Sequence, residues 1–261
     1  MIKNLLITAG IAFVASIACI TGAAALIGHD VRTKDWNLSL VKVGDHVQMV
    51  KGQAAKPEPT ANATLAWSGD NRLAIDVPGQ VVYTQGPVAN VTVTGPQRLV
   101  GRVRLDGGRL YLAPGPDTSA SIHVHLDHNG RFDLVGPDTQ LRVTITAPSV
   151  TTFSLSGDGD LSIHDYDQSA LDIALNGSGA IEADGRTQTL KLDQAGSGGV
   201  DLTSLKAQDA DISLSGSGNA EVHATGKTQI GISGSGTVAL TTKPATLTTS
   251  ISGSGTVNQD Y

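Results

Sequence analysis

Apolar and polar residues alternate along most of the chain from Leu65 onward, in runs rich in valine, isoleucine, leucine and threonine. Examples are RLAIDV at 72–77, VANVTVTG at 88–95 and LRVTITAPS at 141–149. A period of two places successive side chains on opposite faces of a β-strand. No stretch after residue 30 has the 3.6-residue period of an amphipathic helix, so the pattern predicts an all-β body.

Two segments within this body carry the sequence signature of a β-hairpin. RLDGGRLYL at 104–112 centres on a Gly-Gly pair, and LDHNGRFDL at 126–134 centres on an Asn-Gly pair. Such pairs favour two-residue turns between antiparallel strands. The part of the body before residue 150 is therefore expected to be rich in hairpins.

A Gly-x-Gly motif occurs six times in the second half of the chain, for example as LSGSGNAEV at 214–222. The first glycines of successive copies recur at a nearly constant interval of roughly 19 residues. Such a period is typical of one turn of a β-solenoid. The motif glycines are Gly157, Gly159, Gly177, Gly179, Gly196, Gly198, Gly216, Gly218, Gly234, Gly236, Gly253 and Gly255.

Aligning the copies on the first glycine gives four columns of apolar residues, two and four positions before it and four and six positions after it. Each repeat is thus one inward-alternating strand, a glycine corner and a second such strand. One unit cannot bury its apolar face alone, but units stacked about 4.8 Å apart bury it together. The prediction is a parallel β-helix, or β-solenoid, of about six coils of 18–20 residues, preceded by hairpin-rich strands.

The motif glycines are expected to supply positive φ at a corner too tight for a Cβ atom. A phosphate-binding loop would need Gly-Lys-Ser/Thr at the start of a helix, and neither feature is present. Gln194 is the odd member of an apolar column, which predicts a bulge or an exposed edge at that coil.

The repeats resemble the head GIN domain family of autotransporter adhesin heads, over roughly residues 61–261. The resemblance is carried by the tandem SGSG turns and by LRVTITAPSVTTFSLSGDGDLSI at 141–163, where a strand leads into the first motif. It implies an exported bacterial β-helix domain of poorly defined function. The family has no established active site, so no functional residues carry over.

The N-terminus predicts export. Lys3 precedes an uncharged run from Leu5 to Ile27, and Ala23 and Ala25 form a small-x-small cleavage motif. Residues 1–30 are therefore interpreted as a signal peptide, or as a membrane anchor if they are not cleaved. Either reading places the protein in the periplasm or elsewhere in the cell envelope.

Residues 31–60, which include Pro57 and Pro59, are predicted to be a linker. The β-helix domain is then expected over residues 61–261.

Composition narrows the classes of partner. Aromatic residues make up only 3% of the chain and charged residues 16%, with a formal net charge of −6. The body has no Lys/Arg cluster, which argues against nucleic acid and against an anionic membrane surface. Membrane contact is expected only through residues 1–30 if they remain uncleaved. The single cysteine, Cys19, lies in that segment, and no cofactor is expected.

Five residues after the first glycine, an outward column contains Glu182, Asp201 and Glu221 on successive coils. Stacked carboxylates repel one another unless a cation or water screens them. This ladder could therefore bind a divalent cation through oxygen ligands. It could also form the acidic side of a glycan-cleaving cleft, or it could be an ordinary solvated column.

A second candidate cluster is HVHLDHNG at 123–130. His123 and His125 are two apart on one strand face, and His128 lies near the turn. This spacing can chelate zinc or copper, and it is equally compatible with exposed histidines that hold no metal.

These features predict a non-enzymatic, exported β-solenoid that acts as an envelope scaffold or as a recognition module of the adhesion type. The expected partners are a polysaccharide or an envelope protein. Self-association through the C-terminal edge is a further hypothesis, because the last repeat has no obvious cap after Val257. The alternative is a carbohydrate-active enzyme or a cation-binding protein that uses the acidic ladder.

Overall fold

The structure is a computed structural model that describes residues 36–43, 46–51, 59–67, 71–115, 122–126, 132–135 and 140–261. Side chains are described only for 59–67, 71–115 and 140–261. The chain divides into two compact units, residues 1–57 with 117–137 and residues 58–116 with 138–261. No helix in the described ranges is long and apolar enough to cross a bilayer. The predicted signal peptide or anchor, residues 1–30, lies outside them.

The smaller unit contains a four-stranded antiparallel sheet in the order β10-β9-β1-β2. Its strands are β1 (Trp36–Val43), β2 (His46–Lys51), β9 (Ile122–Leu126) and β10 (Phe132–Val135). Strands β1 and β2 fall within residues 31–60, where the sequence analysis expected a linker. The alternation of Leu38 and Leu40 with polar neighbours explains these strands. The proline-containing stretch that follows them led the whole segment to be interpreted as a linker.

The larger unit begins with strands that pair irregularly. Strand β6 pairs with β3 on one side and with β11 on the other, both in antiparallel orientation. Strand β11 also pairs in parallel with β5, and β4 pairs in parallel with β8. These elements are β3 (Thr60–Leu65), β4 (Arg72–Asp76), β5 (Gly79–Gln85), β6 (Asn90–Pro96), α2 (Gln97–Val100), β7 (Val103–Asp106), β8 (Arg109–Leu112) and β11 (Leu141–Ala147).

The hairpin predicted at 104–112 is confirmed. Strands β7 and β8 are antiparallel, with Asp106 opposite Arg109, and the two turn residues Gly107 and Gly108 have φ of 52° and 74°. Positive φ at both central residues is the requirement of a type I′ turn. Strands β9 and β10 are also antiparallel, whereas the Asn-Gly turn predicted between them lies outside the described residues.

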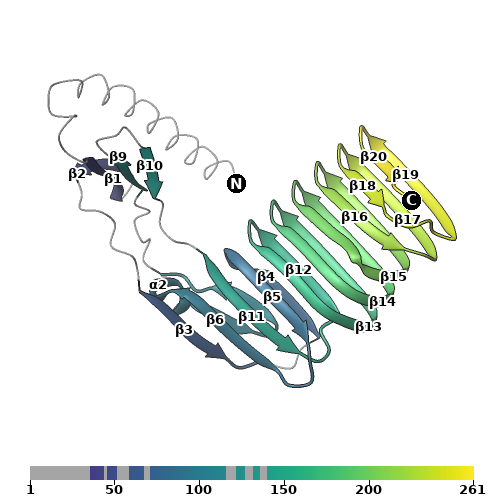
Figure 1. The fold of residues 1–261 in the computed structure, drawn as a ribbon, viewed down its shortest axis with the longest axis horizontal. Coiled ribbons are helices and arrows are strands. Elements are labelled where there is room, and N and C mark those ends of the chain that lie inside the picture. The colour runs from purple at the N-terminus through teal and green to yellow at the C-terminus, as the bar shows by residue number, and fades with distance from the viewer. Residues whose placement is uncertain are drawn as a thin grey trace. The chain divides into compact units, whose positions relative to one another are not determined.

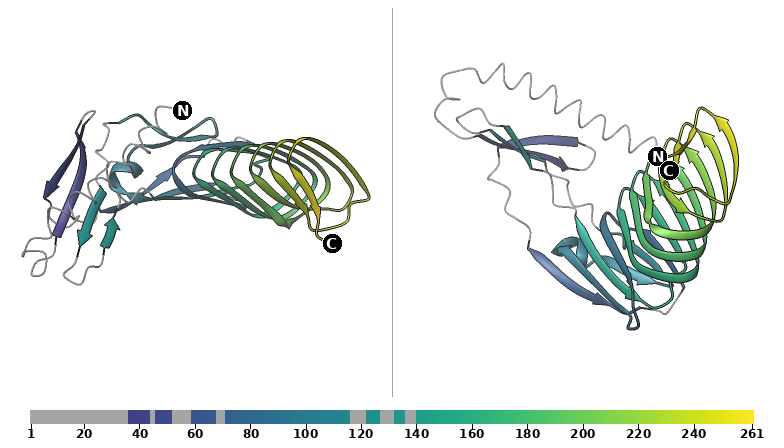
Figure 2. Two further views of the ribbon diagram at one scale, coloured as in Figure 1. Left: turned by 90° about the horizontal axis from the view of Figure 1, so that it is seen from above. Right: turned by 45° about the vertical axis from the view of Figure 1, so that its right-hand side comes forward.

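The rest of the larger unit is a β-solenoid of about five turns, which confirms the predicted fold class (Figure 1). Figure 2 shows its coils nested one behind another. The first glycine of each motif lies opposite the first glycine of the next coil, as at Gly157, Gly177 and Gly196. The strands are β12 (Thr152–Gly157), β13 (Asp160–Gly177), β14 (Ala180–Gly196), β15 (Gly199–Gly216), β16 (Asn219–Ala224), β17 (Lys227–Gly234), β18 (Thr237–Leu240), β19 (Thr246–Gly253) and β20 (Thr256–Gln259).

The predicted inward columns form the core. Leu155, Leu175 and Leu214 are buried in one column, and Leu161 and Ile181 are buried in another. Aliphatic side chains fill the narrow section between the sheets, so the stack needs few aromatic residues. Its two buried aromatic residues, Phe153 and Tyr166, lie where the coils meet the irregular strands.

Tyr83, Phe153 and Tyr166 form that aromatic group, with ring centroids 4.9 and 6.4 Å apart in edge-to-face geometry. The Tyr83 hydroxyl donates a hydrogen bond of 2.8 Å to the carbonyl oxygen of Ala147. Burial raises the pKa of both tyrosines, so they remain neutral members of the core.

Both glycines of a stacked motif, such as Gly196 and Gly198, lie too close to the preceding coil for a Cβ atom, and the first one has positive φ as well. Gly196, the first of its motif, has φ of 127°, as predicted for these corners. Gly179, the second of its motif, has no positive φ, but a Cβ atom there would collide with the carbonyl oxygen of Gly159 in the preceding coil. The prediction of positive φ for both glycines is therefore wrong for the second one, which is needed for close stacking.

Gln194 also differs from the prediction, because it causes neither a bulge nor an exposed edge. Leu175, Gln194 and Leu214 lie opposite one another in unbroken register, and Gln194 is only 2% exposed. Its Nε2 atom donates a hydrogen bond of 2.6 Å to the carbonyl oxygen of Gly198. The amide is long enough to reach its own glycine corner, so the coil keeps its path, although Oε1 has no hydrogen-bond partner.

The coils differ in length only at the corner opposite the glycines, which we call the variable corner (residues 164–166, 183–185, 203–206, 223–226 and 241–245). Strand register shifts there between Ile163 and Tyr166, between Glu182 and Gly185, and between Leu202 and Ala207. Because the irregularity is confined to one corner, the remaining columns stay aligned through all the coils.

Candidate functional site

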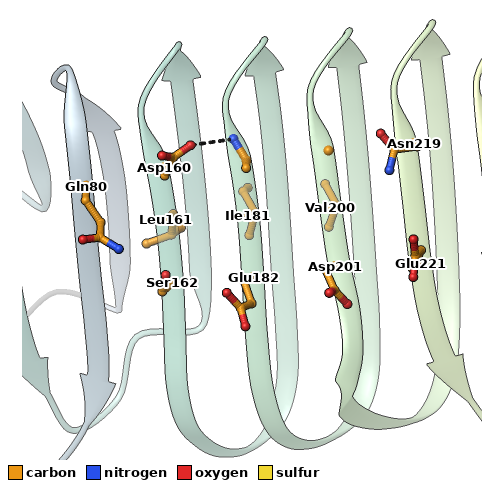
Figure 3. Close-up of a pocket in the computed structure, with 12 residues that line it drawn as sticks. Gln80, Asp160, Leu161, Ser162, Ile181, Glu182, Val200, Asp201, Asn219 and Glu221 are labelled. Carbon is orange, nitrogen blue, oxygen red and sulfur yellow. Dashed lines mark hydrogen bonds between the residues drawn. The ribbon is translucent and has the colours of Figure 1, made fainter.

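The larger unit carries a shallow hollow of about 360 Å³ on the outer face formed by β5, β13, β14, β15 and β16 (Figure 3). Polar side chains surround it, and the side chains labelled in Figure 3 project from neighbouring parallel strands. Its outward polar residues are Gln80, Asp160, Ser162, Glu182, Asp201, Asn219 and Glu221.

The hollow results from two missing side chains in one outward column. Asp160, Ala180, Gly199 and Asn219 lie opposite one another on successive coils. Ala180 and Gly199 provide almost no side chain, whereas Asp160 and Asn219 stand on either side of them. The floor is therefore close to backbone, and the walls along the solenoid axis are a carboxylate and an amide.

The structure brings together the three carboxylates that the sequence placed in one column. Glu182, Asp201 and Glu221 are register neighbours along one side of the hollow, at the usual strand spacing of about 4.8 Å. All three are exposed. They form an acidic column beside the small-residue floor.

Two of the acidic groups in the hollow are fixed by local hydrogen bonds. Asp201 Oδ1 accepts hydrogen bonds from the Thr203 backbone N–H at 3.0 Å and from the Thr203 hydroxyl at 2.7 Å. Asp160 Oδ1 accepts a hydrogen bond of 3.3 Å from the Ala180 backbone N–H, drawn as a dashed line in Figure 3. Each of these carboxylates keeps a second oxygen for other partners.

This geometry gives no positive support to a metal site or to a catalytic pair. Within the part of the chain that the structure describes, no three or more His, Cys, Asp or Glu side chains are arranged to hold a metal ion. A glycosidase acid usually depends on an apolar pocket that favours its neutral form, and Glu182 and Glu221 are open to solvent. The cation-ladder reading of this column remains a hypothesis.

The histidine cluster predicted as a weak metal site is not tested. His123 and His125 belong to β9, but their side chains, and His128 as a whole, lie outside the described residues.

The structure adds an ion pair at the variable corner that the sequence analysis missed. His164 Nδ1 lies 2.6 Å from Asp184 Oδ2, and Asp184 Oδ1 accepts a hydrogen bond of 3.0 Å from the Asp165 backbone N–H. Asp165 has φ of 55°, the only positive φ of a non-glycine residue in the described ranges. His164 and Asp184 are separated by one repeat, so the period of the motif contained the signal for their contact.

These contacts change the acidity of Asp184. Partial burial alone would raise its pKa, but the hydrogen bonds from His164 and Asp165, together with the charge of His164, outweigh burial and hold the pKa below its usual value. The pair therefore links two adjacent coils through a carboxylate whose ionised form is favoured by its neighbours.

A second ion pair links the same two coils. Arg186 binds Asp167 through two hydrogen bonds of 2.8 and 2.6 Å. Gln85 binds the backbone of Asp167 from the other side, at 2.9 and 3.3 Å. These contacts tie three successive strands together next to the variable corner, so their role is to stabilise the fold.

Comparison with known proteins agrees with this architecture. The model of the family described as "Putative auto-transporter adhesin, head GIN domain" matches residues 71–244, which is more than half of the chain. No curated protein sequence matches the chain.

Solved structures share the fold at low sequence identity. A "putative adhesin" from Bacteroides fragilis is 19% identical, with a TM-score of 0.56 over 77% of this chain and 97% of that chain. A "Putative lipid binding protein" from Parabacteroides distasonis is 19% identical, with a TM-score of 0.44 over 76% of this chain and 96% of that chain. The first similarity supports the fold alone, and the second is too weak to carry an argument.

Proposed function

Because the chain belongs to the head GIN domain family, we propose that it is a non-enzymatic, exported module of the adhesion type in the periplasm or cell envelope. The hollow on its outer face is the proposed contact surface. The single observation that carries this proposal is the small-residue floor of Ala180 and Gly199, flanked by polar side chains.

The chemistry of the hollow favours a neutral or amine-bearing polysaccharide. Carboxylates accept hydrogen bonds from sugar hydroxyls, and the Gln80 and Asn219 amides both donate and accept. The acidic column would repel an anionic polymer, and it would attract an ammonium group. An extended chain can lie over the hollow because the floor rises no higher than the backbone between the coils.

The experiment that tests this proposal fills the hollow. A Cβ atom on Gly199 would contact only the Asn219 side chain, at 3.5 Å or more, so Gly199→Gln adds a side chain to the floor without a backbone clash. Ser213→Gln is the matched control, because Ser213 is exposed in the same strand, β15, beyond the variable corner. Binding is measured for the full chain on an array of neutral, amine-bearing and anionic polysaccharides.

We expect the wild type to retain neutral or amine-bearing glycans, Gly199→Gln to bind at least tenfold more weakly, and Ser213→Gln to bind like the wild type. Equal binding by the two variants would show that the hollow is not the contact surface. Absence of binding to every polysaccharide would overturn the choice of ligand, and release of shorter glycans would overturn the non-enzymatic reading.

A further inference from the structure

The last described coil of the solenoid leaves its inward column open. Ile251 is 46% exposed, whereas Ile232, its counterpart in the previous coil, is 2% exposed. Leu247 and Val257, which also lie in inward columns, are only partly buried. The cross-section of the core is therefore uncovered at β19 and β20, the yellow strands of Figure 1.

The opposite end of the larger unit is covered. Strand β4 extends the β12 side of the stack, and the β7–β8 hairpin follows it. Leu99 and Val100 of α2 are buried in the core there. The fold thus closes one end of its core, and in the described chain it leaves the other end open.

The open end also lacks the usual protection of an edge strand. Within the described residues, β19 pairs only with β17 and β20 pairs only with β18. Edge strands are normally protected by charged residues, proline or a bulge. Residues 245–259 contain no charged residue and no proline, and the register between β17 and β19 is unbroken.

We propose that this edge is an interface with a second copy of the chain, formed by antiparallel pairing of β19 with its counterpart about a two-fold axis. A two-fold interface uses the same patch on both copies, and this patch is compatible with itself. Pairing centred on Thr249 sets Leu247 opposite Ile251 of the second copy, so the two inward columns meet as one core.

Charge supports a second copy as the occupant. The chain has a formal net charge of −6, so most of its surface repels a second copy. Most charged positions of the solenoid lie in the earlier coils, and the last coil provides an uncharged run, residues 245–259, between Lys243 and Asp260. Strand β19 contains only hydroxyl-bearing and apolar side chains before its glycine. An identical strand can therefore pair with it without placing like charges opposite each other on either face of the sheet.

The first test measures mass. The full chain is purified in a mild detergent, because residues 5–27 are uncharged, and its mass is followed by light scattering over a concentration series. We expect the mass to rise to twice the monomer value for the wild type and to remain monomeric for Thr249→Lys, which places like charges opposite each other. Gln229→Lys is the matched control, since Gln229 is exposed one coil inside the edge, and it should dimerise like the wild type.

The second test uses cysteine pairs and does not depend on the strength of association. In a Cys19→Ser background, Thr249→Cys should form a disulfide-linked dimer under mild oxidation, because opposite antiparallel residues lie within disulfide range. Gln229→Cys should remain monomeric. The proposal is overturned if the wild type is monomeric at every concentration, if Thr249→Lys still dimerises, or if both cysteine variants cross-link equally.

Discussion

At the scale of single residues, the motif glycines are the most constrained positions in a coil, and the second glycine is so without a positive φ. Gly179 has no room for a Cβ atom beside the carbonyl oxygen of Gly159, and Gly198 has none beside that of Gly179. The Gly-x-Gly sequence suggests a flexible turn, but in the stacked coils it allows the backbones of neighbouring coils to lie in close contact. The demand comes from the neighbouring coil and cannot be read from one copy of the motif.

This contact predicts a large difference between two glycine substitutions. Gly179→Ala should destabilise the fold by about 3 kcal/mol, because overpacking against backbone cannot be relieved by a rotamer change. Gly231→Ala, whose Cβ would lie 4.0 Å from the nearest atom, should change the free energy of unfolding by less than about 0.5 kcal/mol. Urea unfolding followed by circular dichroism measures both, and equal midpoints would contradict the stacking argument.

The His164–Asp184 pair predicts a pH dependence. Because the pKa of Asp184 is lowered in the folded state, the pair stabilises the fold above the ordinary aspartate pKa, and this stabilisation is lost as the pH falls through the lowered value. Asp184→Asn should therefore lower the Tm at pH 6. The expected change is only about 1–2 °C, because the pair is half-exposed and screened by solvent. The Tm difference from the wild type should shrink steadily as the pH falls from the ordinary aspartate pKa toward and below the lowered one.

Arg186→Gln is a useful comparison, since it breaks the other ion pair of the same corner and leaves Asp184 unchanged. If Asp184→Asn were equally destabilising at pH 3 and pH 6, its effect would come from packing rather than from the charge of the carboxylate.

At the scale of elements, one inward column lies beneath the glycine corners that follow the first motif. The Cδ2 atoms of Leu155, Leu175 and Leu214 lie beneath the second glycines of the next coils, at Gly179, Gly198 and Gly236. The amide of Gln194 occupies the equivalent place beneath Gly218, and Ile232 Cγ2 occupies it beneath Gly255. The column thus accepts an amide of similar length, at the cost of one oxygen without a partner.

Gln194→Leu should therefore stabilise the protein. The substitution removes a buried oxygen without a partner and one hydrogen bond, and it restores the side chain found in the neighbouring coils, so a gain of about 1 kcal/mol is expected. Leu214→Gln is the reverse control and should destabilise the fold. Thermal melts of both variants measure the change in stability. A lower Tm for Gln194→Leu would mean that the hydrogen bond to Gly198 stabilises the fold by more than the unpartnered oxygen destabilises it.

At the scale of the whole molecule, the repeat determines how much of the fold could be predicted from the sequence. A fixed period gives the positions of the strands and corners and the register between coils. The sequence was therefore sufficient to place Glu182 beside Asp201 and Leu155 beside Leu175. The irregular strands could not be placed, because β4 pairs with β12 from a distant part of the chain and no period relates Arg72 to Thr152. The hollow could not be predicted for a different reason. It forms because Ala180 and Gly199 have almost no side chain, and small residues carry no chemical group that would indicate a site.

The variable corner has a consequence for how this protein can change over time. Residues can be gained or lost there, as the unequal repeat lengths show, without moving a single glycine of the opposite corner. Longer insertions at the same corner would project from the stack as a row of loops at regular intervals. The solenoid can therefore diversify along one ridge while its interior remains unchanged, much as antibody domains vary their loops on a constant framework.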